Sequence, residues 1–205
     1  MVAEKLDLSK TDLAYYKARK TPEIRELLPY NYLTIEGQSA PDNPKFMEAI
    51  ETLYAVAYSV KFLAKAEDDD FVVPKMEGFW WIAGGAEAQA EFENTPQDQW
   101  FWKIMIRMPD FIRQDHFKRA VEIVTFKKTP QNIDQIQFEE INEGKSAQIL
   151  HIGSYNDEKL TIEKLHQFIA DQNLEITGNH HEIYITDPRR TPEEKLKTII
   201  RYAVR

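Results

Sequence analysis

Cysteine is absent from this 205-residue chain, which excludes disulfide bonds, thiolate metal ligands and cysteine nucleophiles. Positive charge is also scarce, because 26 Lys and Arg stand against 34 Asp and Glu, giving a formal net charge of -8. Binding to nucleic acid phosphates generally needs a basic face, so we expect no nucleic acid partner. The sequence has neither a signal-peptide-like N-terminus nor a run of about 18 apolar residues that could span a bilayer. We therefore expect a cytoplasmic protein with no membrane partner.

The short motifs of several enzyme and cofactor-binding classes are missing as well. Gly84-Gly85 belongs to no dinucleotide or phosphate-binding loop, and no Gly-x-Ser-x-Gly elbow occurs. Asp68-Asp69-Asp70 lacks the pattern of a calcium loop. His180 and His181 are neighbours on a predicted strand, so their side chains point to opposite faces, and no further ligand stands at a metal-site spacing. We expect no metal and no cofactor.

The elements that the sequence does predict follow the same order twice. Tyr30 to Gln38 has the residues of a strand, and Asn43 before Pro44 marks the start of a helix. Apolar residues at three- and four-residue steps continue this helix for about six turns, to the loop at Asp68. Two predicted strands follow, at residues 76–83 and 99–108. A second set then consists of a strand at 145–153, a helix that starts at a cap at Asp157, a strand around Glu182 and a strand at 197–204.

This repetition predicts an α+β fold made of duplicated β-α-β-β units. Their strands would form one antiparallel sheet, with the helices on one side and a ligand cleft where the units meet. We expect residues 1–29 to be an N-terminal arm with a turn or two of helix, and residues 30–205 to form the binding domain. Repeat 1 covers about 30–107 and repeat 2 about 145–205. The connection 110–142 contains a helix at 111–126 and a strand at 134–142, expected to form a hairpin with the next strand at Glu143-Gly144.

The strand around Glu182 carries the strongest candidate for a functional group. Side chains alternate between the faces of a strand, so Ile183 and Ile185 share one face, and Glu182, Tyr184 and Thr186 share the other. The isoleucines indicate the core face. The carboxylate and the phenol then face either a cleft or open solvent, and in the second case Glu182 is an ordinary exposed residue paired with an arginine.

Aromatic residues that could form the walls of a cleft are plentiful, with four Trp, nine Tyr and eleven Phe. Trp100 and Trp102 share one face of their predicted strand, while the neighbours Trp80 and Trp81 point to opposite faces. Packing in the core is the more common role of such residues. The candidate ligand-binding residues are Trp102, Trp80, Trp81, Tyr54, Tyr58, Phe138 and Tyr155.

The segment from His181 to Arg190, followed by Lys195 to Arg201, resembles the GyrI-like small-molecule-binding family. The resemblance implies duplicated SHS2-type units with a cleft between them, and a cleft-facing glutamate on the penultimate strand. Some stand-alone members of similar length are cyclopropanoid cyclopropyl hydrolases, which open the strained ring of yatakemycin- and duocarmycin-type genotoxins. On this resemblance Glu182 is the candidate base and Tyr184 its partner. Burial in an aromatic cleft would raise the pKa of Glu182 and suit it to that role.

Two functions remain open from the sequence. The first is a hydrolase that opens cyclopropanoid genotoxins with water and so protects the cell. The second is a binding module in which Glu182 neutralises a lipophilic cationic drug for sequestration or sensing, and aromatic rings add cation–π attraction. Both predict a small-molecule partner, and neither fixes the oligomeric state.

Overall fold

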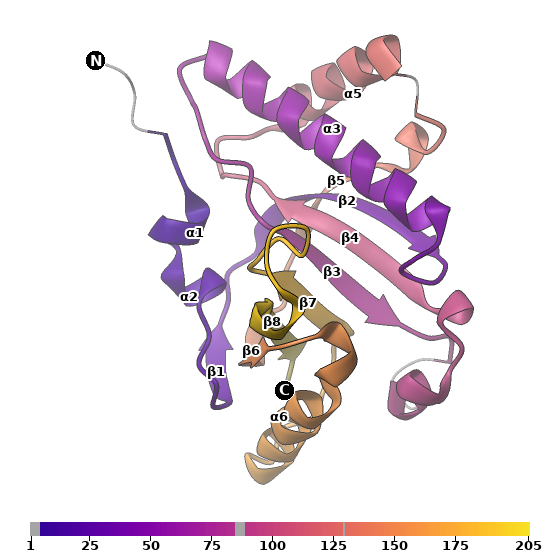
Figure 1. The fold of residues 1–205 in the computed structure, drawn as a ribbon. Helices are drawn as coiled ribbons and strands as arrows, with labels where there is room; N and C mark the ends of the chain where they lie inside the picture. The colour runs from indigo at the N-terminus through magenta and orange to yellow at the C-terminus, as the bar shows by residue number, and fades with distance from the viewer. Residues whose placement is uncertain (1–4, 85–88, 129) are drawn as a thin grey trace.

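The computed structural model describes residues 5–84, 89–128 and 130–205. Within them, eight strands form one antiparallel sheet in the order β1-β6-β8-β7-β3-β4-β2-β5, and the helices pack around it (Figure 1). The predicted α+β class and the antiparallel sheet are therefore confirmed. None of the described helices is both long and apolar enough to cross a membrane.

The duplicated unit is visible in the chain order and in the sheet order. The first unit comprises β2 (Tyr30–Gln38), α3 (Pro44–Ala66), β3 (Met76–Trp81) and β4 (Phe101–Arg107). The second comprises β6 (Lys145–Ile152), α6 (Lys159–Asp171), β7 (His180–Tyr184) and β8 (Lys197–Ala203). In the sheet order, the strands β6-β8-β7 of the second unit are followed by the strands β3-β4-β2 of the first unit. The two units therefore meet at the antiparallel pair of β7 and β3. That junction places residues of both units side by side.

Shorter elements surround these two units. The arm contains α1 (Leu8–Thr11), α2 (Leu13–Tyr16) and β1 (Glu23–Glu26), and the connection contains α5 (Gln114–Lys128) and β5 (Gln137–Ile141). Short 3-10 helices occur at Gln89–Asn94, Gln97–Gln99, Ile133–Gln135, Tyr155–Asp157 and Glu193–Lys195. The arm strand was not foreseen from the sequence. It pairs with β6 at one end of the sheet, while β5 pairs with β2 at the other end.

The predicted hairpin at Glu143-Gly144 is wrong. β5 and β6 lie at far separated places in the sheet order, although residues 142–144 alone join them. Four chain steps span at most about 14 Å, whereas six strand spacings in a flat sheet would need roughly 29 Å. The sheet must therefore curl strongly. Glu143 explains why no tight turn forms, because its side chain is buried against His181 and Arg201 on the inner face of the curl.

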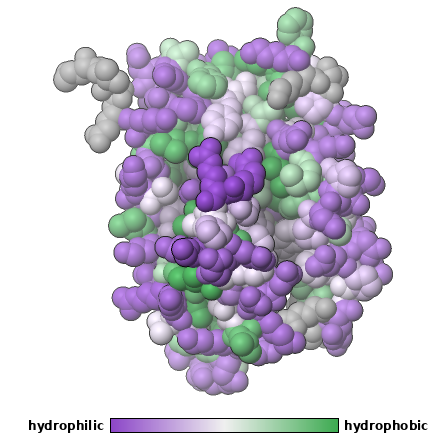
Figure 2. Space-filling model, in the orientation of Figure 1, coloured by the Kyte–Doolittle hydropathy of each residue, from purple (hydrophilic) through white to green (hydrophobic). Residues whose placement is uncertain are grey.

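Hydrophobic contacts fill both faces of the sheet. α3 starts as predicted, with Asn43 accepting a hydrogen bond from the Lys45 amide, and packs its buried side on β2, β3 and β4. α6 packs on β6 and β8. The opposite face is covered by the arm, whose Tyr15 is fully buried next to Ile183 and Met105. On the face seen in Figure 2, hydrophilic side chains dominate, with apolar patches between them.

The predicted helix cap at Asp157 is wrong by one residue. Tyr155–Asp157 forms a 3-10 turn, and Glu158 stands at the N-cap position of α6 without a capping side-chain hydrogen bond. The Glu158 side chain instead turns into the space between α6 and β7. That space is part of a cleft.

Candidate functional site

A cleft of about 1930 Å³ lies at the junction of the two units. α3 lines one side, the first turn of α6 and the loop after β7 line the other, and the cleft faces of β3 and β7 form the floor. Several apolar side chains of α3 are exposed toward it, including Met47, Tyr58 and Phe62. Such an opening is larger than an ordinary ligand pocket and can accept an extended molecule.

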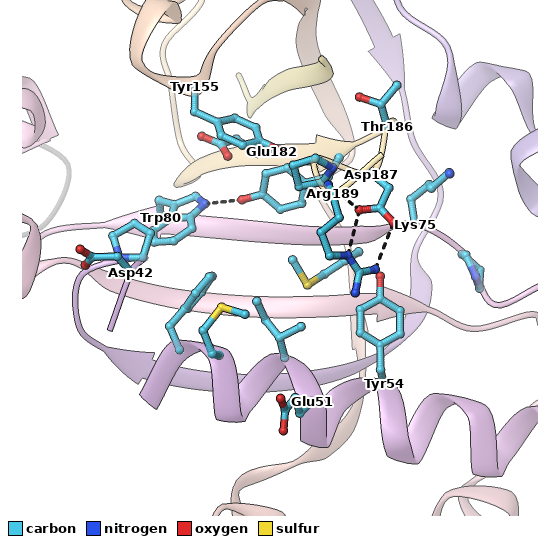
Figure 3. Close-up of a pocket in the computed structure, with 18 of the residues that line it drawn as sticks. Asp42, Glu51, Tyr54, Lys75, Trp80, Tyr155, Glu182, Thr186, Asp187 and Arg189 are labelled. Atoms are coloured by element: carbon cyan, nitrogen blue, oxygen red, sulfur yellow. Dashed lines mark hydrogen bonds and ion pairs between the residues drawn. The ribbon is translucent and has the colours of Figure 1, made fainter. Parts of the chain in front are cut away.

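Glu182 lies on the cleft floor (Figure 3). Tyr184 also lines the cleft, from the same face of β7. Ile183 is fully buried on the opposite face, among residues of the arm. The Trp80 indole Nε1 donates a 3.0 Å hydrogen bond to the Tyr184 hydroxyl. Gly78 makes this contact possible, because a Cβ there would lie 3.1 Å from Trp80 Nε1 and 3.2 Å from the Tyr184 oxygen. The floor is thus built from both units.

Two further ionisable side chains meet Glu182. His180 Nε2 lies 2.8 Å from Glu182 Oε1, and His180 Nδ1 lies 2.7 Å from the Tyr202 hydroxyl. Glu158, which is only 4% exposed, lies within hydrogen-bonding reach of Glu182 from the start of α6. A carboxylate accepts from an imidazole N–H, so the Glu182 hydrogen bond places a proton on His180 Nε2.

The two carboxyl groups have opposite proton affinities. Burial, followed by the charge of Glu182, raises the pKa of Glu158 to about 10. Burial also opposes ionisation of Glu182, but hydrogen bonds from His180, Tyr184 and Glu158 outweigh it and lower the pKa of Glu182. Burial acts in the expected direction, but the net shift of the Glu182 pKa is downward, opposite to the predicted rise. Near neutral pH the pair holds one proton on Glu158 and one negative charge on Glu182.

The same three side chains have the donor set of a metal site, because ligand atoms of Glu158, His180 and Glu182 lie within 4.8 Å of one another. The contacts account for them without an ion. His180 Nε2 is already hydrogen-bonded to Glu182, and Glu158 shares its proton with that carboxylate. The sequence argument against a metal had two grounds. The divergence of His180 and His181 is confirmed by the register of β7. The lack of a further ligand near His180 is wrong, because Glu182 and Glu158 both lie beside it.

Four of the seven candidate aromatic residues line the cleft. They are Tyr54 and Tyr58 on α3, Trp80 on β3, and Tyr155 before α6. The Tyr155 ring meets the Tyr184 ring edge-on, with centroids 5.8 Å apart. Burial, and then the charge of Glu182, raise the pKa of Tyr155 to about 12, so its phenol stays a hydrogen-bond donor.

The other three candidates lie outside the cleft. Trp102 is 3% exposed in the core under α3, where its ring occupies space that a Cβ of Gly37 would need, 2.3 Å away. Trp81 faces the other side of the sheet and stacks on Phe101. Phe138 packs beside Phe117 at the β5 edge. Alternation assigns a face to each strand residue, but it does not say how far α3 covers that face.

Several cleft residues were missed by the sequence argument. Trp100 lines the cleft rather than Trp102, and Phe92 stacks on it at 4.3 Å. His180 could have been found, because it shares the face of Glu182 and Tyr184 by strand alternation. Glu158 had no signal, because its approach to Glu182 depends on how α6 docks on the sheet.

Comparison with known proteins gives a consistent result. The family model for the GyrI-like small molecule binding domain matches residues 20–205. The chain is similar to an uncharacterized conserved protein from Listeria innocua, with 33% identity over 98% of this chain and 100% of that one and a TM-score of 0.90. It is also similar to a hydrolase encoded by lin2189 from Listeria innocua, with 31% identity, coverage of 98% and 100%, and a TM-score of 0.87.

A more distant structure shares the fold. The C-terminal domain of EcmrR matches with 13% identity over 90% of this chain and 97% of that one, and a TM-score of 0.57. None of the curated protein sequences compared with the chain matches it.

Proposed function

The chain belongs to the GyrI-like small-molecule-binding family, and on that premise we propose that it hydrolyses cyclopropanoid genotoxins of the yatakemycin and duocarmycin type. The observation that carries the proposal is one ionised carboxylate, Glu182, on the floor of an aromatic-lined cleft. Solved structures from Listeria innocua that are similar to this chain are named as those of a hydrolase, which supports hydrolytic chemistry on this fold.

Glu182 acts as the general base in this proposal. A flat substrate packs between the apolar side of α3 and Trp80, with its cyclopropane above β7. A water held by Glu182 attacks the CH₂ carbon of the ring, a C–O bond forms, and the ring C–C bond breaks. The electron pair moves to the conjugated carbonyl oxygen, which takes a proton from solvent at the open mouth, while Glu182 takes the proton of the water. The dienone ring that carried the cyclopropane becomes aromatic, so the step is favourable in free energy.

Tyr184 has a positioning role beside this base. Its phenol donates to Glu182 and accepts from Trp80, which fixes the direction of the carboxylate. Burial, together with the charge of Glu182, raises the pKa of Tyr184 well above its ordinary value, so it remains protonated and keeps donating. The lowered pKa of Glu182 makes it a weak base that is always ionised at neutral pH. General-base assistance contributes roughly 10²–10⁴-fold.

Replacing Glu182 by glutamine tests the proposal. Glu182→Gln keeps the size of the side chain and removes the base, so turnover of a duocarmycin-type cyclopropanoid should fall roughly 100-fold or more. Ring-opened hydrate is measured by mass spectrometry, and binding by fluorescence of the cleft tryptophans. Glu163→Gln is the matched control, because Glu163 is an exposed residue of α6 that does not line the cleft. Full turnover in Glu182→Gln would remove Glu182 as the base.

A second candidate function is favoured by the charge of the floor. Within the described ranges neither Glu158 nor Glu182 forms an ion pair with a lysine or arginine. A lipophilic cation could therefore be held by Glu182 without turnover, with aromatic contacts adding about 0.5–2 kcal/mol each. If the unmodified protein binds flat cations tightly and leaves a cyclopropanoid intact, sequestration or sensing is the function.

A further inference from the structure

The cleft floor holds an acid and a base side by side, and cyclopropanoid opening uses only the base. In a cyclopropanoid the electron pair leaves toward a carbonyl oxygen across the conjugated ring, several bonds from the attacked carbon. The Glu158 proton cannot serve an atom so far away, because Glu158 and Glu182 contact each other. The proton of Glu158 is therefore not used in cyclopropanoid opening.

Three features of its surroundings favour the protonated form of Glu158. Its side chain is buried, it faces the charged Glu182, and its Oε1 has no hydrogen-bond partner among the described residues. Two carboxylates cannot both be ionised at this distance without a cation between them. The burial of Glu158 and the hydrogen bonds of Glu182 to His180 and Tyr184 decide which of the two is charged.

An acid and a base in contact suit a substrate whose leaving atom is bonded to the attacked carbon. Epoxides and acyl compounds both satisfy this condition. An acyl substrate also needs donors for its oxyanion, usually backbone N–H groups. Around Glu182 the backbone of β7 is paired on one side with β3 and on the other with β8, so its N–H groups are used in the sheet. An epoxide needs no such donors, because its oxygen takes a proton as it leaves.

We propose that the Glu158–Glu182 pair hydrolyses aryl-substituted epoxides bound in this cleft. The inference rests on the proposed role of Glu182 as base. A water attacks the aryl-bearing carbon, its C–O bond forms, and the ring C–O bond breaks. Glu182 takes the proton of the water, and Glu158 gives its proton to the ring oxygen, so epoxide and water yield a vicinal diol. Glu182 then returns the proton to Glu158 through their contact.

The aromatic side chains around the pair fit the aryl group. Trp80 and Trp100 stand edge to face with centroids 6.1 Å apart on one side of the floor, and Tyr155 stands on the other side. An aryl ring between them places its attached epoxide over Glu182 and Glu158. The apolar rim on α3 leaves room for a second ring, so diaryl epoxides should be better substrates than alkyl ones.

The test uses purified full-length protein with trans-stilbene oxide and styrene oxide as probes. Diol is measured by chromatography, and mass spectrometry in ¹⁸O-labelled water should show one labelled oxygen per diol. The same samples are assayed with a duocarmycin-type cyclopropanoid. Diol formation above the buffer rate supports the epoxide inference whether or not the cyclopropanoid is turned over, so the two proposals fail separately. Absence of diol at millimolar probe overturns it.

Variants then locate the acid. Glu158→Gln keeps the shape but holds no transferable proton, so epoxide turnover should fall roughly 100-fold. The ratio of epoxide turnover to cyclopropanoid turnover should fall at least about tenfold in this variant. General unfolding would lower both rates and would not change the ratio. Glu163→Gln, on the same helix, should behave like the unmodified protein. An unchanged ratio in Glu158→Gln overturns the role of Glu158.

Two further outcomes would overturn the inference in other ways. Hydrolysis of an aryl ester but not of either epoxide would assign the pair to acyl chemistry. Loss of epoxide turnover with a chelator, restored by a divalent ion, would replace the proton on Glu158 by a metal. Turnover that is unaffected by a chelator supports the proton pair.

Discussion

Each face of β7 carries a histidine that contacts glutamates, but the two faces differ in how the negative charge of those glutamates is balanced. His180 and His181 are consecutive, point to opposite faces, and each meets a glutamate at hydrogen-bond distance. On the inner face, His181 Nε2 lies 3.1 Å from Glu77 and Nδ1 lies 3.0 Å from Glu143. On the cleft face, His180 reaches Glu182, and Glu182 reaches Glu158.

The inner-face cluster contains an arginine, and no arginine forms an ion pair with the described Glu158–His180–Glu182 group on the cleft face. Arg201 is fully buried, lies 3.6 Å from Glu143, and donates to the Tyr15 carbonyl and to Gln148. The Tyr15 hydroxyl donates to Glu77, so the arm covers this cluster. Burial opposes a charge on His181, but Glu143 and Glu77 outweigh it and raise the pKa of His181. Two carboxylates, an imidazolium and a guanidinium then balance.

The difference indicates a division of work between the faces. On the inner face every charge has a resident partner, and the cluster fixes the arm and the curled sheet. On the cleft face the partner of the second carboxylate is only a proton, which a reaction or a ligand can displace. Changes on the inner face should therefore reduce stability, whereas changes on the cleft face should alter function and leave the protein stable.

Arg201→Met should have the largest effect on stability. The substitution leaves Glu143 and Glu77 buried with one cation fewer, and removal of one partner of a buried ion pair typically costs about 3–5 kcal/mol. Urea denaturation followed by tryptophan fluorescence measures this loss of the free energy of unfolding. Arg205→Gln, in an exposed pair with Glu175, is the control and should change little. A loss below about 1 kcal/mol for Arg201→Met would show that the inner cluster does not hold the fold together.

Glu158→Gln should have a smaller effect of the opposite sign. The pKa of Glu158 is raised from 4.5 to about 10, so the folded state keeps a proton that the unfolded state releases above about pH 4.5. Glu158 therefore contributes less to stability as pH rises between these values. At pH 8 the variant should be more stable than the unmodified protein by about 1–2 kcal/mol, because burial of the ionisable group is removed.

The pH dependence distinguishes this explanation from better packing. The stability gain of Glu158→Gln should shrink toward zero at pH 4.5 and grow toward pH 9, measured as the difference between two denaturation series. Glu163→Gln should show no such difference. A gain that is constant with pH would contradict a protonated Glu158 in the folded protein.

The sequence predicted the fold better than it predicted the cleft. The repeated element order and strand alternation depend on local patterns, and they found the two units and the face shared by Glu182 and Tyr184. The hairpin at Glu143-Gly144 failed because a sheet that curls can join distant strands with a short connection. The prediction that Trp102 binds the ligand was wrong, because α3 covers this residue and Gly37, which has no side chain, leaves space for its ring. Glu158 was missed because only the docking of α6 brings it to the floor.

Arg189→Gln, at the mouth of the cleft, should have the smallest effect. Arg189 is exposed and forms a surface ion pair with Asp187, and such pairs contribute little to stability in water. The midpoint of denaturation should stay within the error of the measurement. Removing a positive charge near the entrance should nevertheless strengthen binding of a lipophilic aryl cation such as ethidium, by less than about threefold at low salt and not at all at high salt. Arg205→Gln removes the same charge far from the cleft and should leave the affinity unchanged. If both variants bind ethidium alike, the cation is not held in this cleft, and the charge of its floor has no part in binding.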